Sequence, residues 1–233
     1  MRLLVSVRSA DEVPTALAGG ADIIDAKEPA RGSLGAVAPG VLSAIDVATP
    51  RLVPLSVALG DWTGPREVRA AMDAARTGER SAPVYLKLGF AGVPSLERLA
   101  PSLAGAVQAA GPRRLVAVGY GDDVAAGAPP AEEVLRAAIA ARTHGFLLDT
   151  WHKDGRSLLD HVSTDRLAQL SATARSAGLL FALAGSLDAD AIARLAALAD
   201  ILGFRGAACG GGRSGTVDRR RVAALRRGMA SGG

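Results

Sequence analysis

The sequence has few aromatic residues, one cysteine and no long apolar run. Aromatics make up 3% of the 233 residues, so a core must be built from alanine, valine, leucine and isoleucine. Because Cys209 has no second cysteine to pair with, a disulfide-stabilised scaffold is excluded. No stretch approaches the roughly 18 apolar residues of a membrane span, and residues 1–7 are too short for a signal peptide. We therefore expect no membrane association and a location in the reducing cytoplasm.

The pattern of a metal site is also missing. His152 and His161 do not have the spacing of a metal-binding pair, and neither cysteine nor histidine lies near Cys209. We expect neither a metal nor another cofactor.

Basic residues exceed acidic ones, and the net charge is +4. Such a surface attracts anionic substrates. The arginines are dispersed except for residues 219–221, Arg226 and Arg227, whose spacing fits the solvent-exposed face of a terminal helix. We therefore expect no nucleic-acid partner, while exposed alanine-rich helices are compatible with a homo-oligomer.

Lysine is scarce as well: Lys27, Lys87 and Lys153 are the three lysines among 27 basic residues. A GC-rich genome would explain the scarcity but not the positions, because each lysine lies at or just beyond the end of an apolar run. Arginine cannot replace a lysine that must lose its proton and attack a carbonyl, since a guanidinium stays charged. We therefore place a candidate active site at these lysines.

Short apolar runs alternate with segments that carry helix signals, which predicts a single-domain α/β protein. Eight such runs in a chain of this size are typical of a TIM (β/α)8 barrel. The alternative is an open doubly wound sheet, but Arg8-Ser9-Ala10-Asp11 replaces the glycine-rich turn that would follow its first strand. The expected strands cover residues 3–7, 22–27, 52–57, 84–88, 115–120, 145–149, 179–184 and 200–204.

Helix signals lie between these runs. Ser9 and Glu12 have the spacing of a capping box, Pro65 suits a first helical position, and Ser163 precedes a further helix. The last helix is expected from residue 218 to 227. The catalytic domain would then cover residues 1–227, followed by a flexible tail over 228–233.

In a TIM barrel the active site lies at the carboxyl ends of the strands. Asp25 and Lys27 share a face of their strand, and Lys87 and Asp149 end two other even-numbered strands, so we expect these side chains to converge with Lys153. Neighbouring positive charge and desolvation favour the neutral amine. Such an amine can form a Schiff base, while a phosphate or carboxylate clamp is the alternative role for any one lysine.

The two aspartates leave their roles open. Asp25 and Asp149 can transfer protons or simply neutralise the lysines, and the sequence does not separate these two roles.

Loops after the seventh and eighth strands commonly bind phosphate in barrels through backbone N–H groups. Gly185, Ser186, Gly206 and Ala207 are the candidates, and Arg205 is either a phosphate contact or an ion-pair partner below the rim.

Two glycine-rich loops are further candidates. Residues 28–35 can close over the site, where Arg31 or Ser33 can hold a second phosphate, whereas a plain connector is the alternative for this loop. Residues 210–215, which follow Cys209, form the second of these loops, and a plain connector is again the alternative.

Motifs along nearly the whole chain resemble one family, the (5-formylfuran-3-yl)methyl phosphate synthases, also called 4-(hydroxymethyl)-2-furancarboxaldehyde-phosphate synthases. The motifs are Asp25-Ala26-Lys27-Glu28-Pro29, Gly32-Ser33-Leu34-Gly35, Leu148-Asp149-Thr150 with Lys153-Asp154-Gly155, Ala182-Leu183-Ala184-Gly185-Ser186, and Arg205-Gly206-Ala207-Ala208-Cys209.

The resemblance implies a barrel of the class I aldolase type. It implies a carbon–oxygen lyase that condenses two glyceraldehyde 3-phosphate molecules into a furan phosphate, with loss of phosphate and water, on the route to methanofuran. It assigns the Schiff base to Lys27 and proton acceptance to Lys87. The aspartate and the lysine of the family's sixth-strand motif correspond to Asp149 and Lys153. The alternatives are another Schiff-base aldolase for phosphorylated sugars, or a catalytically idle barrel that binds a phosphorylated metabolite or nucleic acid.

Overall fold

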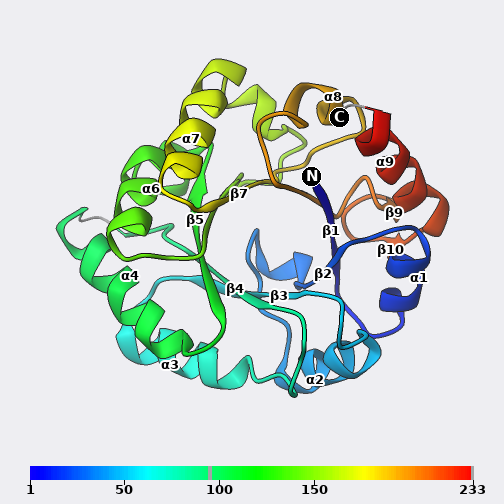
Figure 1. Ribbon diagram of the computed structural model, residues 1–233, viewed down its shortest axis with the longest axis horizontal. Coiled ribbons are helices and arrows are strands. Elements are labelled where there is room, and N and C mark those ends of the chain that lie inside the picture. The colour runs from blue at the N-terminus through cyan, green and yellow to red at the C-terminus, as the bar shows by residue number, and fades with distance from the viewer. Residues whose placement is uncertain (94–95, 232–233) are drawn as a thin grey trace.

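The structure is a computed structural model that describes residues 1–93 and 96–231. Eight parallel strands pair in sequence order and close into a barrel, with β8 returning to β1. Helices surround this ring of strands, and the C-terminal helix α9 lies against the first strand β1 (Figure 1). The predicted single-domain TIM barrel is confirmed. The strands are β1 Arg2–Val7, β2 Ile23–Ala26, β3 Leu55–Asp61, β4 Val84–Gly89, β5 Arg114–Tyr120, β6 Gly145–Asp149, β7 Leu180–Leu183 and β8 Ile201–Phe204.

The helices begin largely where the sequence signals predict. Pro65 is the first residue of its helix, and the Ser163 side chain accepts a hydrogen bond of 3.2 Å from the Arg166 N–H. The helices are α1 Glu12–Ala18, α2 Pro39–Ala48, α3 Pro65–Ala74, α4 Leu96–Ala110, α5 Asp123–Ala126, α6 Ala131–Ala140, α7 Thr164–Ser176, α8 Asp190–Leu195 and α9 Arg219–Ser231, with 3-10 turns η1 Pro29–Arg31 and η2 Leu158–Asp160 and a small hairpin of β9 Cys209–Gly210 and β10 Thr216–Val217.

The last helix is longer than predicted. α9 continues beyond Arg227 to Ser231, and Met229 is buried in the core, so this stretch has a packing partner. The rest of the predicted tail, 232–233, lies outside the described residues. None of the described helices has the length and hydropathy of a membrane span.

The third strand starts later than predicted and extends further. Leu52 is 80% exposed and lies in a turn, and β3 instead spans Leu55–Asp61. The buried Arg80 guanidinium donates hydrogen bonds to the backbone carbonyls of Thr49, Pro50 and Val53, which fixes the preceding turn. As a result, Asp61 reaches the carboxyl end of the barrel.

The predicted capping box at the first helix is wrong. Glu12 is buried, and its carboxylate lies 2.6 Å from the Arg205 guanidinium at the end of β8 instead of capping Ser9. The same carboxylate accepts a hydrogen bond of 2.8 Å from the Arg8 N–H. An ion pair between α1 and β8 was not readable from local spacing, because its two members are far apart in sequence.

Small residues leave space inside the barrel. The inner wall carries Gly145, Ala182 and Gly203, whereas the large rings of Phe146 and Phe181 stack outside the strands, between barrel and helices. The inner wall therefore encloses a cavity of about 310 Å³, which opens at the carboxyl ends of the strands.

Candidate active site

All three lysines of the chain line this cavity, together with Asp25 and Asp149. Lys27 and Lys87 are buried, with 6% and 5% of their surface exposed. Strands β2, β4 and β6 place these side chains because alternate residues of a strand point to the same side. The predicted convergence of the lysines and carboxylates at one end of the barrel is therefore present in the structure.

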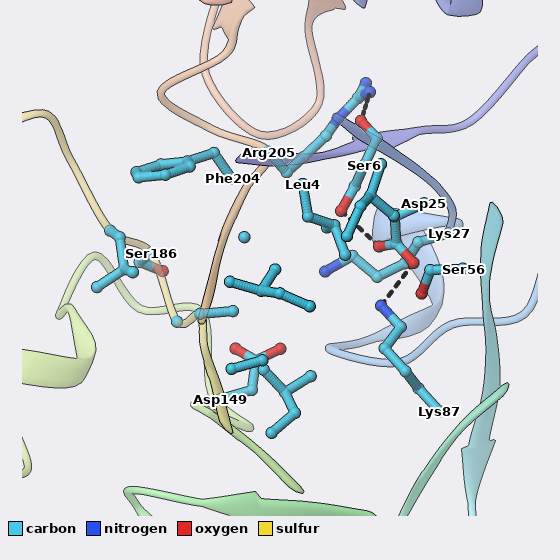
Figure 2. Close-up of a pocket in the computed structure, with 18 of the residues that line it drawn as sticks. Leu4, Ser6, Asp25, Lys27, Ser56, Lys87, Asp149, Ser186, Phe204 and Arg205 are labelled. Atoms are coloured by element: carbon cyan, nitrogen blue, oxygen red, sulfur yellow. Dashed lines mark hydrogen bonds and ion pairs between the residues drawn. The ribbon is translucent and has the colours of Figure 1, made fainter. Parts of the chain in front are cut away.

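Asp25 connects three strands on one side of the cavity. Its Oδ1 lies 2.6 Å from Lys87 Nζ, and its Oδ2 accepts a hydrogen bond of 2.7 Å from the Ser6 hydroxyl (Figure 2). Burial alone would raise the pKa of Asp25, but the charges of Lys87 and Lys27 outweigh burial and lower it. Asp25 is thus an anion that holds the Lys87 side chain in place through an ion pair.

Lys153 and Asp149 form a second charged pair. Lys153 Nζ donates to Asp149 Oδ1 at 2.8 Å, to the Thr150 carbonyl at 2.6 Å and to the Thr150 hydroxyl at 2.9 Å. Burial alone would raise the pKa of Asp149, but Lys153 and Lys27 hold it at about 2. These three acceptors match the three N–H donors of an ammonium.

Lys27 differs from the other two lysines. Its Nζ has no hydrogen-bond or ion-pair partner among the residues that the structure describes, and Figure 2 shows the amine extending into the cavity toward Asp149. Burial lowers the pKa of Lys27 to about 8; Asp149 opposes this effect and the charge of Lys87 adds to it. A substantial fraction of this amine is therefore neutral near pH 8, which is the form that attacks a carbonyl.

The loops after β7 and β8 line another part of the same cavity. Gly185, Ser186, Gly206 and Ala207, the predicted phosphate-binding residues, all lie there. Gly185 has a φ of 106°, and a Cβ at this position would lie 3.0 Å from the Thr150 nitrogen. Ser186 has a φ of 50°, which is uncommon for a residue other than glycine and is concentrated at ligand sites.

Arg205 is not available for phosphate. Its side chain makes five hydrogen bonds: to Glu12 through both carboxylate oxygens, and to the carbonyls of Ser6, Arg213 and Gly215. A guanidinium has five N–H donors, so all of them are used within the protein. Of the two roles left open by the sequence, the structure has the ion pair, and it gives no support to the phosphate contact.

Ser33 lies outside the main cavity. It is 2% exposed, and its hydroxyl is buried near Tyr120. Ser33 instead lines a neighbouring cavity beneath residues 28–36, which we call the β2 loop.

Three residues of the site were missed from the sequence. Arg213 lines both cavities, and its Nη2 donates to the Pro29 and Gly32 carbonyls of the β2 loop, at 3.1 and 2.7 Å. Its place inside the glycine-rich run 210–215 was the available signal. The Tyr120 hydroxyl donates a hydrogen bond of 2.6 Å to Asp61 at the rim. This pair was not predicted because β3 extends further than its sequence pattern indicated.

Comparison with known proteins identifies the family. The model of the 4-HFC-P synthase family matches residues 3–226. The chain is 38% identical over 235 residues to the (5-formylfuran-3-yl)methyl phosphate synthase of Methanocaldococcus jannaschii, covering 97% of this chain and 98% of that protein. The protein of the same name from Methanothermobacter thermautotrophicus is 36% identical, with the same coverage.

The chain belongs to the 4-HFC-P synthase family. Membership in this synthase family makes the protein an enzyme with a furan phosphate synthase role. Solved structures with a similar fold are the phosphoribosyl anthranilate isomerases of Thermus thermophilus (TM-score 0.66, 16% identity) and Thermotoga maritima (TM-score 0.65, 13% identity), each covering 99% of both chains. At these identities they support the TIM barrel and nothing about the reaction.

Amines and carboxylates are the charged groups that meet where β2, β4 and β6 end. Within the described part of the chain, no group of three or more histidine, cysteine, aspartate or glutamate side chains is arranged to hold a metal ion. The arrangement of one unpaired amine between two ammonium–carboxylate pairs is suited to covalent catalysis on a carbonyl substrate.

Proposed function

We propose that the enzyme condenses two molecules of glyceraldehyde 3-phosphate into (5-formylfuran-3-yl)methyl phosphate through a Schiff base at Lys27. The observation that carries the proposal is the unpaired, buried amine of Lys27 beside two lysines that are both ion-paired. Atom balance requires that one orthophosphate and two waters leave. The family membership supports the product, and the site geometry supports the covalent route.

The first step joins Lys27 to the aldehyde carbon of one triose. The neutral amine attacks, a proton moves to the carbonyl oxygen, and water leaves as the iminium forms. This step takes up one proton, which the ammonium of Lys87 or Lys153 can supply inside the cavity. Asp25 and Asp149 keep these two ammonium groups in place.

The iminium then serves as an electron sink. It acidifies the adjacent carbon, and loss of that proton to a neutral lysine gives an enamine. Electron release from the enamine nitrogen breaks the carbon–oxygen bond to phosphate at the next carbon and leaves a conjugated iminium. The central carbon of the second triose, as an enediol formed by loss of its proton to a lysine, then bonds to the terminal carbon of this iminium. This bond gives the branched carbon skeleton of the product. The enol oxygen of the triose on Lys27 closes the ring on the aldehyde carbon of the second triose, and loss of two waters forms the furan. Hydrolysis of the iminium, which takes back the water released when it formed, frees Lys27. No step requires an oxidant or reductant, which agrees with a site made of lysines and aspartates.

Two measurements test the proposal. Incubation with glyceraldehyde 3-phosphate alone should produce an ultraviolet-absorbing furan phosphate, identified by mass spectrometry. Borohydride added during turnover should attach a triose-derived mass to the peptide that contains Lys27. The Lys27→Arg variant keeps the charge but loses both signals; full turnover by this variant would exclude the covalent route. A different sugar phosphate as product would favour another Schiff-base aldolase.

A further inference from the structure

A second cavity lies beside the first one. It measures about 580 Å³ and is bounded by the β2 loop, the end of β3 and residues 151–153 after β6. Lys153 and Arg213 line both cavities, so the two spaces meet at these side chains. A ligand in the second cavity would therefore lie next to the lysine cavity, on the side of the β2 loop.

The charges around this second cavity favour an anion. Arg31, Arg213 and Lys153 contribute cationic side chains, of which Lys153 is already paired with Asp149, and Asp61 is the carboxylate among its lining residues. Asp61 Oδ1 already accepts hydrogen bonds from the Tyr120 hydroxyl at 2.6 Å and from the Ala91 N–H at 2.9 Å. The cations therefore outnumber the carboxylate, and the carboxylate is already hydrogen-bonded to groups of the protein.

Two guanidinium groups have donors to spare. The Arg31 side chain is exposed. Its one hydrogen bond to the described part of the chain is long, at 3.4 Å, and goes to the Ala36 carbonyl. Arg213 uses Nη2 for the β2 loop, while its Nε and Nη1 have no partner among the described residues. Arg205, in contrast, has no donor left. Arginine donors in a fork geometry suit the oxygens of a phosphate monoester.

We propose that the second cavity binds the phosphate of the second triose through Arg31 and Arg213. This inference rests on the proposed two-triose condensation. The loops after β7 and β8 then hold the phosphate of the triose that is attached to Lys27, and the second triose approaches past Lys153. Because Arg213 also holds the β2 loop, phosphate binding and loop closure share one side chain.

The binding test uses inorganic phosphate and does not depend on turnover. Trp151 is 38% exposed and lines the second cavity, and the chain has one other tryptophan, Trp62. In a Trp62→Phe background, phosphate should produce a saturable change in Trp151 fluorescence. Adding Arg31→Ala should weaken the phosphate affinity about tenfold or more, as expected for the loss of a charge-assisted hydrogen bond. Arg98→Ala is the control, because Arg98 is an exposed arginine beside a different surface cavity.

The kinetic test separates the two substrates. Arg31→Ala should raise the KM for furan formation about tenfold or more, while borohydride still attaches one triose to Lys27 at the wild-type rate. Intact trapping also shows that the variant is folded. The inference is overturned if phosphate affinity and KM stay within twofold of wild type, or if trapping is lost in parallel with furan formation. Failure of wild-type trapping would instead contradict the proposed Schiff base.

Discussion

The Asp25 carboxylate and the Lys87 amine lie 2.6 Å apart and join β2 to β4. This ion pair occupies the carboxylate two residues before Lys27, and the Asp149 carboxylate is occupied in the same way by Lys153. Lys27 is left in a cavity whose charges are already matched in pairs. The consequence is an amine with a lowered pKa, because burial acts on it without a compensating ion pair.

The first prediction concerns the pH dependence of the wild-type enzyme. Lys27 must be neutral to attack, and its pKa is about 8, so kcat/KM should rise as the pH increases through about 8. This rise is the acidic limb of the pH profile. The rate of borohydride trapping between pH 6 and 10 measures this limb directly. A limb centred near the ordinary lysine value of about 10.4 would contradict the environment described for Lys27.

Replacing Asp149 should move this limb. Burial is the main influence on Lys27, and the strongest opposing one is the negative charge of Asp149, which raises the Lys27 pKa. Asp149→Asn removes that charge, so the trapping rate should rise at a lower pH than in the wild type, even if turnover falls. Asp154→Asn changes an exposed aspartate that pairs with Arg156 and should leave the limb in place. Equal limbs in the two variants would mean that Asp149 does not act on Lys27.

The buried pair of Glu12 and Arg205 predicts a loss of stability. Glu12→Gln leaves the Arg205 charge without its carboxylate in a site that is nearly closed to water, which should lower the free energy of unfolding by about 3–5 kcal/mol. Urea denaturation measures the effect. Glu133→Gln removes an exposed ion pair with Arg136 and should cost at most about 1 kcal/mol. Similar losses in both variants would show that the buried pair has no special role.

Gly89 is expected to tolerate no side chain. A Cβ at this position would lie 2.3 Å from both Asp61 Oδ1 and the Tyr120 hydroxyl oxygen. Gly89→Ala should therefore break or displace this hydrogen-bonded pair and destabilise the protein by about 1–3 kcal/mol. Gly105→Ala is the matched control, because the space around Gly105 in α4 is open and alanine favours a helix. The two thermal unfolding midpoints should shift in opposite directions.

Local patterns predicted those parts of the fold that depend on neighbours in sequence. Pro65 and Ser163 mark helix starts because capping and ring geometry act over a few residues. The start of β3 was placed too early because Leu52 belongs to an apolar run. The turn that exposes Leu52 is fixed by Arg80, a residue distant in sequence.

The sequence by itself determined the barrel and the meeting of the three lysines, since alternating apolar runs and helices close in one way and strand ends collect at one rim. Only the tertiary structure decided which groups are free to react. Arg205 uses all its donors on Glu12 and three carbonyls, and the Ser33 hydroxyl is buried. Lys27 alone of the three lysines has an unpaired amine within the described residues. Such outcomes depend on contacts between distant segments, and local sequence patterns do not encode which partner satisfies a buried charge.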